Sequence, residues 1–295
     1  MNKVSVYGGL GNQMFQYAFG VALNEKGKKT RPSFSGFLYD HHHNGFNLGQ
    51  AFQLKLSIPA SLLNFFLVHG KIFYKNKFSA FVCRKLVQAN HNIRYKIYKE
   101  KREFEYDPNV FEQRSAFFVG VWQVESYFKD IKKKIQETFV FNEPGDEVNI
   151  ALIDKIKNSS SISLHIRRGD YLHAKWMESL VVIKDNTYYE GAINYMNEKI
   201  KDPHYFVFSD DIKWAQENLK LPNVTYVDHN TGTKSYIDMY LMSLCKHNII
   251  ANSSFSWWGA WLNKNEQKIV VMPERWFNRD YCEGIFPEEW VKMKL

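Results

Sequence analysis

The chain has few cysteines and no long apolar run, and both absences exclude classes of protein. Its three cysteines (Cys83, Cys245 and Cys282) are far apart and odd in number, which argues against a disulfide framework and a CxxC metal site. No charge-free apolar run reaches about 18 residues, so we expect no transmembrane helix. The N-terminus also lacks the apolar core and cleavage site of a signal peptide. We therefore expect a cytoplasmic protein, soluble or peripherally attached to the inner membrane.

Several catalytic and metal-binding signatures are missing as well. The sequence contains no HExxH metal helix and no pattern that indicates a Ser-His-Asp triad. The glycine turn GGLGNQ at residues 8–13 lacks the third glycine of a GxGxxG dinucleotide fingerprint. The triplet His41–His43 suits a metal poorly, because adjacent loop side chains diverge and no acidic or cysteine partner is spaced with them. We therefore expect no metal.

Hydrophobic and basic residues are abundant. Hydrophobic residues make up 45% and aromatic residues 16% of the 295 positions, which excludes disorder and provides enough chain for two domains or one large one. The formal net charge of +8 favours a polyanionic partner such as nucleic acid, anionic lipid or a phosphorylated small molecule. Because the basic residues are scattered outside any recognised nucleic-acid-binding motif, we expect no nucleic acid partner.

The first half of the chain begins with a βα unit and becomes less regular. We expect a strand at 3–7, then the glycine turn, then a helix at 14–26 whose first N–H groups could meet an anion. Residues 31–57 are rich in loop-forming residues, and residues 60–102 are predicted to be helical, basic and aromatic. For this basic segment a solvated face is one interpretation, and contact with an anionic membrane is the other. A strand at 117–123 and a helix at 128–139 are expected next.

The second half alternates strands and helices. A break around Pro144 predicts an interdomain linker at 142–160. Beyond it, apolar strands separated by single helices predict a parallel sheet that is covered on both faces. The strands are expected at 161–167, 204–209, 224–228, 248–251 and 268–272, and the helices at 188–200, 211–219, 235–246 and 255–263.

Polar residues follow three of these strands. The carboxyl ends of parallel strands meet at one edge of a sheet, where ligands bind. The first end carries His165, Arg167, Arg168 and Asp170, and a guanidinium suits a phosphate because its parallel N–H donors match the phosphate oxygens. Consecutive strand side chains face opposite ways, so we expect one arginine to reach a ligand and the other to be tied down, with Asp170 as its candidate partner.

The other two strand ends carry acids and hydroxyls. Asp210 could accept hydrogen bonds from a base or ribose, while Asp211 could cap the next helix. A metal site at this aspartate pair is disfavoured, because the arginines already supply positive charge. Ser253 and Ser254 precede an aromatic helix, so they form a phosphate site or simply cap that helix. Its tryptophans are expected to fill the core.

Five sequence blocks, spread over almost the whole chain, resemble the bacterial α-1,2-fucosyltransferases of glycosyltransferase family 11. They are GGLGNQMFQYAFG at 8–20, GVWQVESYF at 120–128, SLHIRRGDYL at 163–172, FSDDIKW at 208–214 and NSSFSWWGAWL at 252–262. The resemblance implies an α/β, GT-B-like fold with two Rossmann-like lobes of parallel sheet and the active site in the cleft between them. Residues 1–145 would form the acceptor-side lobe, and residues 146–295 the lobe that binds GDP-fucose.

The resemblance also implies an activity. It is the inverting transfer of L-fucose from GDP-L-fucose to the 2-hydroxyl of an acceptor sugar, usually β-galactose, without a required metal or other cofactor. The acceptor would be an oligosaccharide or a lipid-linked glycan precursor of a surface polysaccharide.

The resemblance assigns roles to residues of this chain. Arg168, Asp170 and Asn12 are the catalytic candidates. The donor-binding candidates are His165, Arg167, Arg168, Asp210, Ser253, Ser254, Phe255, Gly11, Asn12 and Gln13, with Asn12 facing the fucose and Asp210 near the guanosine.

The base, the acceptor site and the substrate class stay open. Asp170, Glu178 and Asp40 are candidates for a carboxylate base, although a loose transition state could need little more than Asn12 to position the hydroxyl. Acceptor contacts are sought in the variable segments 31–57 and 172–187, where Asp40, His42 and Glu178 are the candidates. One alternative is an inverting transferase for another nucleotide sugar, and another is a non-catalytic nucleotide- or polyanion-binding protein.

Overall fold

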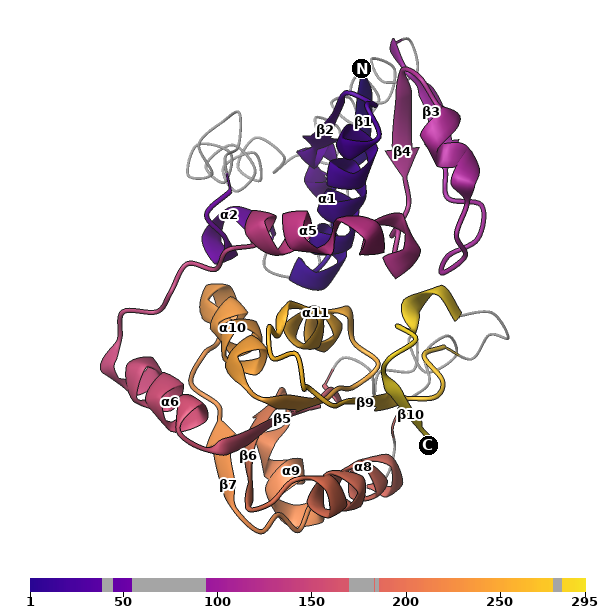
Figure 1. Cartoon of the computed structure of the whole chain (residues 1–295). Coiled ribbons are helices and arrows are strands. Elements are labelled where there is room, and N and C mark those ends of the chain that lie inside the picture. The colour runs from indigo at the N-terminus through magenta and orange to yellow at the C-terminus, as the bar shows by residue number, and fades with distance from the viewer. Residues whose placement is uncertain (39–44, 55–93, 170–182, 184–185, 278–282) are drawn as a thin grey trace. The chain divides into compact units, whose positions relative to one another are not determined.

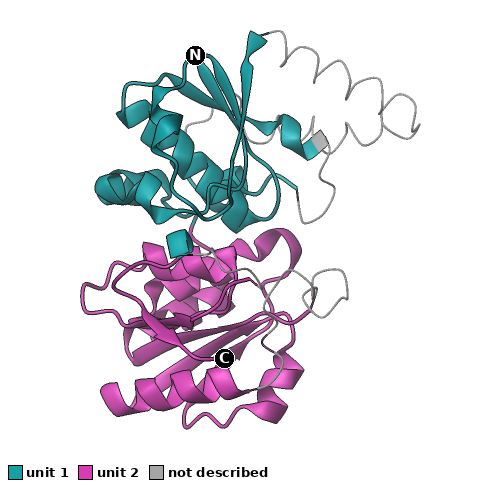
Figure 2. Cartoon of the chain, turned by 90° about the vertical axis from the view of Figure 1, so that its right-hand side faces the viewer, with its two compact units in different colours: residues 1–142, 283–285 teal, residues 143–282, 286–295 magenta. Residues whose placement is uncertain are grey.

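The computed structural model describes residues 1–38, 45–54, 94–169, 183, 186–277 and 283–295, and it separates into two compact units (Figure 1). Unit 1 comprises Met1–Asn142 and Glu283–Ile285, and unit 2 comprises Glu143–Cys282 and Phe286–Leu295 (Figure 2). Each unit has its own parallel sheet. The α/β class and the two parallel-sheet units that the resemblance implied are therefore confirmed.

Unit 1 is built on a four-stranded sheet with the order β2-β1-β4-β3. All three strand pairs are parallel. The strands are β1 (Asn2–Ser5), β2 (Thr30–Ser33), β3 (Lys96–Lys99) and β4 (Ala116–Val119). The α-helices are α1 (Leu10–Glu25), α2 (Leu48–Ala51) and α5 (Lys132–Thr138). Short 3-10 turns are η1 (Phe34–Leu38), η2 (Pro108–Glu112), η3 (Glu125–Tyr127), η4 (Lys129–Ile131) and η7 (Glu283–Ile285).

An aromatic core holds α1 against this sheet. The chain leaves β1 through Gly8, whose φ of 82° lies in the left-handed region that glycine adopts readily. The apolar face of α1 then buries Phe19, whose ring stacks on Trp122 at 4.3 Å between centroids. Phe118 of β4 and Tyr127 of η3 meet the Phe19 ring edge-on at 5.3 and 5.0 Å. These rings fix the loop after β4 to the helix after β1.

Unit 2 is built on a six-stranded parallel sheet with the order β10-β9-β8-β5-β6-β7. Counted from β5, this is the 3-2-1-4-5-6 order of a doubly wound nucleotide-binding fold, with its switch point between β5 and β8. The strands are β5 (Ser160–Ile166), β6 (Pro203–Ser209), β7 (Val224–Val227), β8 (His247–Ile249), β9 (Val270–Pro273) and β10 (Val291–Met293). The helices are α6 (Glu147–Lys157), α8 (Thr187–Lys199), α9 (Ile212–Asn218), η6 (Gly232–Lys234), α10 (Tyr236–Leu244) and α11 (Ser254–Leu262).

Helices cover both faces of this sheet. Figure 1 shows α8 and α9 on one face and α10 and α11 on the other. Leu164 and Ile166 of β5 pack into the core with α8, whereas Phe206 and Phe208 of β6 pack with α6 and α10. Because alternate residues of a strand face opposite ways, His165 points to the α10–α11 face. His165 therefore lies on the face of the sheet from which α11 begins.

The predicted alternation of strands and helices between residues 161 and 272 is confirmed, with boundaries shifted by a few residues. The predicted linker at 142–160 is wrong, because most of it forms α6, which begins where the Asp146 side chain accepts a hydrogen bond from Asn149 N at 3.0 Å. The helical prediction for 60–102 is wrong over β3, a strand that pairs with buried β4. The rest of that segment, up to residue 93, lies outside the described residues.

The described part of the chain contains no helix that is long and apolar enough to span a membrane. Over the same residues, no group of three or more histidine, cysteine or acidic side chains is arranged to hold a metal ion. Cys245 is buried as a free thiol, and burial raises its pKa. Cys83, Cys282 and most of the basic segment 60–102, for which a solvated face or membrane contact was expected, lie outside the described residues.

Candidate functional site

The sheet of unit 2 brings the three predicted strand ends together. Leu164 of β5 pairs with Ile249 of β8, and Ile166 of β5 pairs with Ser209 of β6. The segments that follow β5, β6 and β8 therefore leave the same edge of the sheet. The first and third segments flank the switch point, where adjacent connections run to opposite faces and leave room for a ligand. The predicted meeting of these strand ends is confirmed.

The two adjacent arginines lie in different surroundings. Arg167 Nη1 is 3.0 Å from Asp210 Oδ2, and its side chain keeps 30% of its surface exposed. The Arg168 side chain is only 11% exposed, with Nε 3.5 Å from Asp211 Oδ2. Its guanidinium carbon lies 4.0 Å from the centroid of the Trp214 ring on α9. One arginine is therefore packed against a helix, as predicted, although the partner described for it is Asp211.

Asp210 anchors the segment after β5. Besides its ion pair with Arg167, it accepts a hydrogen bond from Arg168 N through Oδ1 at 2.9 Å. A Cβ at Gly169 would lie 2.9 Å from Asp210 Oδ2, so only glycine leaves room for this contact. Both carboxylate oxygens are thus used by the loop that carries the arginines. This arrangement gives Asp210 a part in shaping the loop that carries the arginines, and the guanosine contact expected from the resemblance stays a prediction.

Asp211 caps α9, as expected, because its Oδ1 accepts a hydrogen bond from Trp214 N at 3.1 Å. The same carboxylate lies beside Arg168. Asp211 therefore joins the start of α9 to the arginine packed against it.

His165 is a buried, neutral side chain. It is 6% exposed, and burial, followed by the positive charge of Arg167, lowers its pKa to about 3. Its ring centroid lies 5.9 Å from that of Phe255 in the first turn of α11. Its Nδ1 is buried with no hydrogen-bond partner among the described residues. A neutral imidazole offers one donor and one acceptor without adding charge.

The start of α11 forms the other side of this edge. Ser253 occupies the N-cap position but makes no side-chain cap hydrogen bond, so the interpretation of Ser253 as a conventional helix cap is wrong. Asn252, just before it, donates through Nδ2 to Trp276 O at 3.1 Å. The N-terminus of α11, which carries a partial positive charge, thus lies beside the hydroxyl groups of Ser253 and Ser254. Trp257, Trp258 and Trp261 are fully buried, as expected for core residues.

The corresponding edge of unit 1 is closed by glutamines. Gln13 is fully buried, donates to Gly8 O and Gly45 O, both at 2.8 Å, and accepts from Asn47 N at 3.0 Å. Gln16 is also fully buried, and it joins Tyr7 N to Gly120 O. All of these bonds go to the backbone. The Gln13 amide is thus bonded on all sides to the backbone, which gives it a structural role. The donor contact predicted for Gln13 stays a prediction.

Asn12 lies between the two central strand ends of this edge. Its Oδ1 accepts a hydrogen bond from Gln123 Nε2 at 2.7 Å. A Cβ at Gly8 would lie 3.1 Å from Asn12 Nδ2, so the glycine leaves space for the amide. Gly11, the neighbouring donor candidate, is part of the first turn of α1. Asn12 is held at the start of the helix, where the sequence predicts it to act.

Four predicted site residues lie outside the described residues. They are Asp170, Glu178, Asp40 and His42. The catalytic base and the acceptor contacts therefore stay predictions.

Two partly buried acids were missed by the sequence analysis. Glu100 accepts from Val121 N at 2.7 Å, and Asp238 accepts from Asn230 Nδ2 at 2.9 Å. Burial raises the pKa of each carboxyl to about 7, against hydrogen bonds that lower it. Around Asp238, Asn149 exchanges amide hydrogen bonds with Asn230 at 3.0 Å. Each acid stands alone in sequence, so only the tertiary contacts reveal them.

Comparisons with known proteins extend over the whole chain. The family model described as Glycosyl transferase family 11 matches residues 1–294. The alpha-1,2-colitosyltransferase of Escherichia coli is 34% identical over 300 residues, which cover 97% of each chain. The O-antigen biosynthesis glycosyltransferase WbnK of Escherichia coli is 31% identical over 312 residues, which cover 97% of this chain and 98% of that protein. The galactoside alpha-(1,2)-fucosyltransferase 1 of Oryctolagus cuniculus is 22% identical over 179 residues, 56% of this chain and 48% of that protein.

Proposed function

The chain belongs to glycosyl transferase family 11, and from this premise we propose that it is an inverting α-1,2-fucosyltransferase. It transfers L-fucose from GDP-L-fucose to the 2-hydroxyl of a glycan, with a β-galactoside as the expected acceptor. One observation carries the proposal: at the switch-point edge of unit 2, the segment after β5 carries Arg167, and the ring of His165 at the end of β5 lies 5.9 Å from that of Phe255 at the N-terminus of α11. A cation, a neutral donor and a helix N-terminus suit the diphosphate of a nucleotide sugar.

The same groups suit the chemical step. Breaking the bond between fucosyl C1 and the phosphate oxygen leaves GDP, so negative charge grows on the diphosphate in the transition state. Preorganised donors at that position stabilise the transition state more than the ground state. A neutral His165 can donate one hydrogen bond there. No proton needs to reach the leaving group if these donors stabilise its charge.

The described contacts favour Arg167 over Arg168 as the arginine that meets the diphosphate. Arg167 keeps exposed surface and its charge acts on His165, whereas Arg168 is stacked on Trp214. We therefore assign Arg167 to the donor and Arg168 to holding the loop against α9. The catalytic role that the sequence predicts for Arg168 becomes a positioning role in this proposal.

On the acceptor side, we propose that Asn12 orients the fucose or the attacking hydroxyl. Its amide is already held by Gln123, which reduces the entropy lost on binding. The base that removes the proton of the hydroxyl is left open among Asp170, Glu178 and Asp40. The proposed acceptor class is an oligosaccharide or lipid-linked glycan precursor.

A second donor is favoured by one finding, the 34% identity to an alpha-1,2-colitosyltransferase. Colitose has the structure of fucose without the 3-hydroxyl. A pocket that hydrogen-bonds this hydroxyl rejects the deoxy sugar strongly, whereas an apolar pocket accepts both. Competition between GDP-fucose and GDP-colitose in one reaction, followed by mass spectrometry of the product, distinguishes the two donors.

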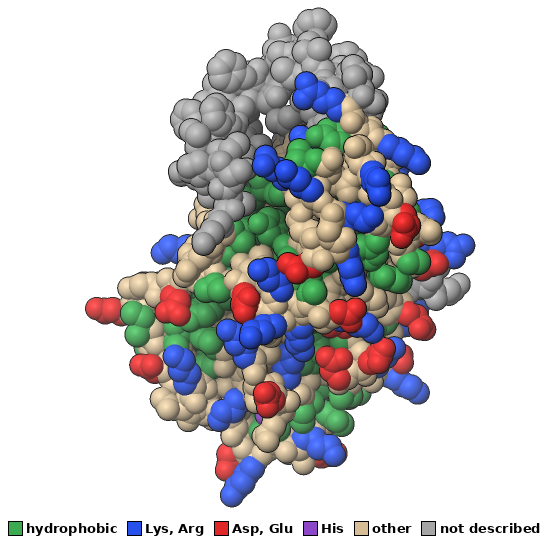
Figure 3. Space-filling model, turned by 45° about the horizontal axis from the view of Figure 1, so that its top comes forward, with side chains coloured by type: hydrophobic (Ala, Val, Ile, Leu, Met, Phe, Trp, Pro, Cys, Tyr) green, Lys and Arg blue, Asp and Glu red, His purple; other side chains and the backbone are tan. Residues whose placement is uncertain are grey.

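Charge alone does not favour the polyanion-binding alternative. On the face shown in Figure 3, acidic side chains are interspersed among the lysines and arginines. The net charge of +8 is therefore not gathered there into one continuous basic surface. Polyanion binding would also not explain why His165 is buried, or why the side chain of the N-cap residue Ser253 makes no cap hydrogen bond.

Incubation with GDP-fucose and lactose in EDTA, followed by mass spectrometry and linkage analysis, tests the proposal. A 2-linked fucosyl-galactose product would support the donor, the linkage and the absence of a metal requirement together. Release of GDP and free fucose without product would mean that lactose is the wrong acceptor. Loss of activity in EDTA with recovery in manganese would overturn the metal-free mechanism. No turnover and no thermal shift with GDP would favour the polyanion-binding alternative.

A further inference from the structure

A partly buried carboxylate fills an anion-binding turn in unit 1. Glu100, the residue after β3, accepts from Val121 N through Oε2 at 2.7 Å. Trp122 N lies 3.2 Å from each of its two oxygens. Successive backbone N–H groups that converge on one point form an anion-binding concavity. In this turn the anion is part of the chain itself.

The turn has a strained conformation. Trp122 has a φ of 55°, which is uncommon for a bulky L residue and costs on the order of 1–3 kcal/mol. Its side chain is fully buried and stacked on Phe19. Gln16 fixes the start of the turn by donating to Gly120 O at 3.1 Å. Glu100 and these two contacts together hold a backbone geometry that the local sequence does not favour.

The turn determines where the next side chain points. Gln123 follows Trp122 directly, and it donates through Nε2 to Asn12 Oδ1 at 2.7 Å. Because an amide oxygen held by a donor leaves the Nδ2 group on the other side, this bond selects one orientation of the Asn12 amide. A change in the backbone at Trp122 would move Gln123 away from Asn12.

We propose that Glu100 is a positioning residue, which holds the Gly120–Gln123 turn so that Gln123 presents the Asn12 amide in its working orientation. The inference rests on the proposed function only for what Asn12 contacts. The contacts that join Glu100, the Gly120–Gln123 turn and Asn12, which we call the clamp, all lie within unit 1.

The charge of Glu100 supports a functional reason for its position. Burial, which outweighs the bonds from Trp122 and Val121, raises its pKa to about 7, and Glu103 adds to the shift. Tyr127 of η3, whose pKa is raised partly by Glu100, also faces it. Burial disfavours the charged carboxylate, while the two backbone N–H groups of the turn favour it. The clamp therefore changes its charge near neutral pH.

A kinetic double-mutant cycle tests the proposed link. Glu100→Gln keeps the size and one acceptor oxygen, and Gln123→Ala removes the connection to Asn12. We expect each variant to lower kcat about tenfold, and the double variant to be no slower than the slower single variant. Multiplied effects, or an unchanged kcat in Glu100→Gln, would overturn the proposal.

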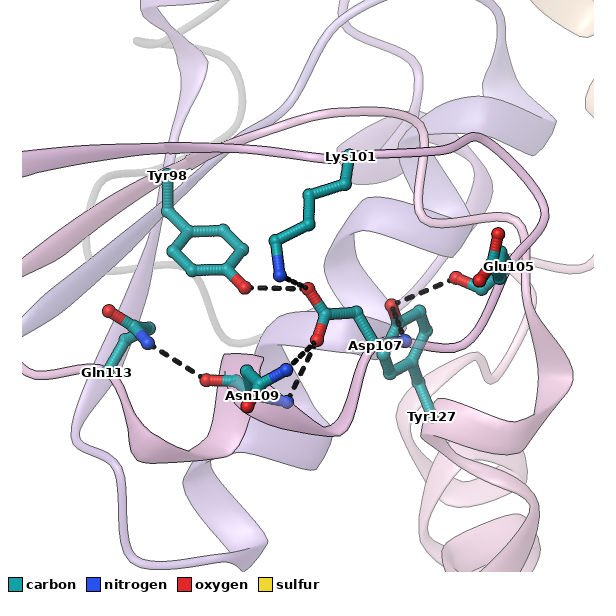
Figure 4. Close-up of polar contacts among 7 residues, drawn as sticks. All are labelled: Tyr98, Lys101, Glu105, Asp107, Asn109, Gln113 and Tyr127. Carbon is teal, nitrogen blue, oxygen red and sulfur yellow. Dashed lines mark hydrogen bonds and ion pairs between the residues drawn. The ribbon is translucent and has the colours of Figure 1, made fainter.

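A second carboxylate in unit 1 provides a matched control (Figure 4). Asp107 accepts from Tyr98 Oη at 2.7 Å and from Asn109 Nδ2 at 2.8 Å, and it pairs with Lys101 at 3.2 Å. None of these partners belongs to the turn at 120–123. Asp107→Asn should therefore leave kcat unchanged below its melting temperature. An equal loss of kcat in Asp107→Asn and Glu100→Gln would mean that the effect is only structural.

A steric variant disturbs the clamp without any substitution of Glu100 itself. A Cβ at Gly120 would lie 2.5 Å from Glu100 Oε2, so Gly120→Ala must displace it. Gly145→Ala is the control, because a Cβ there meets nothing within 4 Å. Gly120→Ala should lower kcat as much as Glu100→Gln does. When Gln123→Ala is already present, Gly120→Ala should cause no further loss of kcat. A wild-type kcat in Gly120→Ala would count against the clamp, even if Glu100→Gln failed to fold.

Amide NMR separates this inference from the proposed function. The amide protons of Val121 and Trp122 should titrate together near pH 7 in the wild type and stay fixed in Glu100→Gln. With that titration present, absence of fucosyl transfer would refute the function and leave the clamp intact. Active enzyme in which Glu100→Gln leaves the Val121 and Trp122 amide signals unchanged at every pH would refute the clamp alone. The pH dependence of kcat should likewise flatten near pH 7 in Glu100→Gln.

Discussion

The carboxyl edges of the two sheets have the same architecture and opposite chemistry. In unit 1 the polar side chains at the edge turn inward, and Gln13, Gln16 and Glu100 are bonded to the backbone around them. In unit 2 the edge carries Arg167 and an α11 N-terminus whose N-cap side chain makes no cap hydrogen bond. The polar side chains of the first edge are thus used up in holding the backbone. The second edge combines a partly exposed cation with a helix N-terminus.

The largest difference should appear when the cation of the unit 2 edge is removed. Arg167→Ala should lower kcat by about 10² or more, because the diphosphate loses a preorganised donor in the transition state. The melting temperature should change little, since the side chain is partly exposed. Steady-state kinetics and calorimetry measure the two effects. Lys213→Ala, which removes a cation that is 84% exposed, is the control. Comparable activity in both variants would refute the donor role of Arg167.

At the unit 1 edge, removing a polar side chain should mainly lower the free energy of unfolding. Gln13→Ala leaves two buried carbonyls and two N–H groups without partners and should cost about 2–3 kcal/mol. Urea denaturation followed by tryptophan fluorescence measures this cost. Gln113→Ala, at an exposed site where Nε2 only meets Asn109 O, should change stability by less than about 0.5 kcal/mol. If Gln13→Ala lost activity at unchanged stability, the assignment of Gln13 to structure would be wrong.

Arg168→Ala should lower both the stability and kcat. The variant loses the stacking on Trp214 and the ion pair with Asp211, so we expect a loss of about 1–2 kcal/mol of stability. Its kcat should fall less than that of Arg167→Ala. Thermal unfolding and kinetics on the two variants side by side make the test. A deeper activity loss in Arg168→Ala with intact stability would reverse the two roles.

The smallest effects concern pH, and they should have opposite signs at two acids of unit 1. Hydrogen bonds from Tyr98 and Asn109, working against partial burial, lower the pKa of Asp107 to about 2, below its unfolded value. Its stabilisation is therefore present above about pH 4 and lost as the pH falls toward 2. The pKa of Glu100 is raised to about 7, so its contribution is most favourable below about pH 4.5 and is lost as the pH rises through 7.

Urea denaturation at several pH values measures both effects, which we expect at about 1 kcal/mol each. The stability of Asp107→Asn relative to the wild type should improve at acid pH. That of Glu100→Gln should improve at alkaline pH. Parallel changes in the two variants would contradict the different environments of the two acids.

The sequence predicted unit 2 better than unit 1 for a physical reason. Strands buried on both faces, such as β6, appear as unbroken apolar runs between helices, so each element can be recognised locally. In unit 1, β3 reads Lys-Ile-Tyr-Lys and lies at the edge of the sheet. Such a strand resembles a basic helical segment until its neighbour is known. Its place beside β4 is a tertiary fact.

The same distinction applies to the site. The strand-end residues His165, Arg167 and Asp210 were found because parallel topology alone brings them together. Strand alternation predicted that the two arginines differ, but only the position of Trp214 shows which one is packed. Glu100 could not be found, because its importance depends on β3 lying next to β4.

The anchor made by Gln13 has a consequence for exchanging segments between relatives. Its partners beyond α1 are backbone groups of Gly45, Asn47 and Leu48, so it reads no side chain there. A chimera that exchanges only residues 31–44, and so keeps Gln13 and the chain from residue 45 onward, should keep the anchor. Only two local rules apply: no proline at 47 or 48, and a residue at 45 that tolerates its φ of 74°. The position just before residue 45 is thus a suitable junction for grafting segments from relatives.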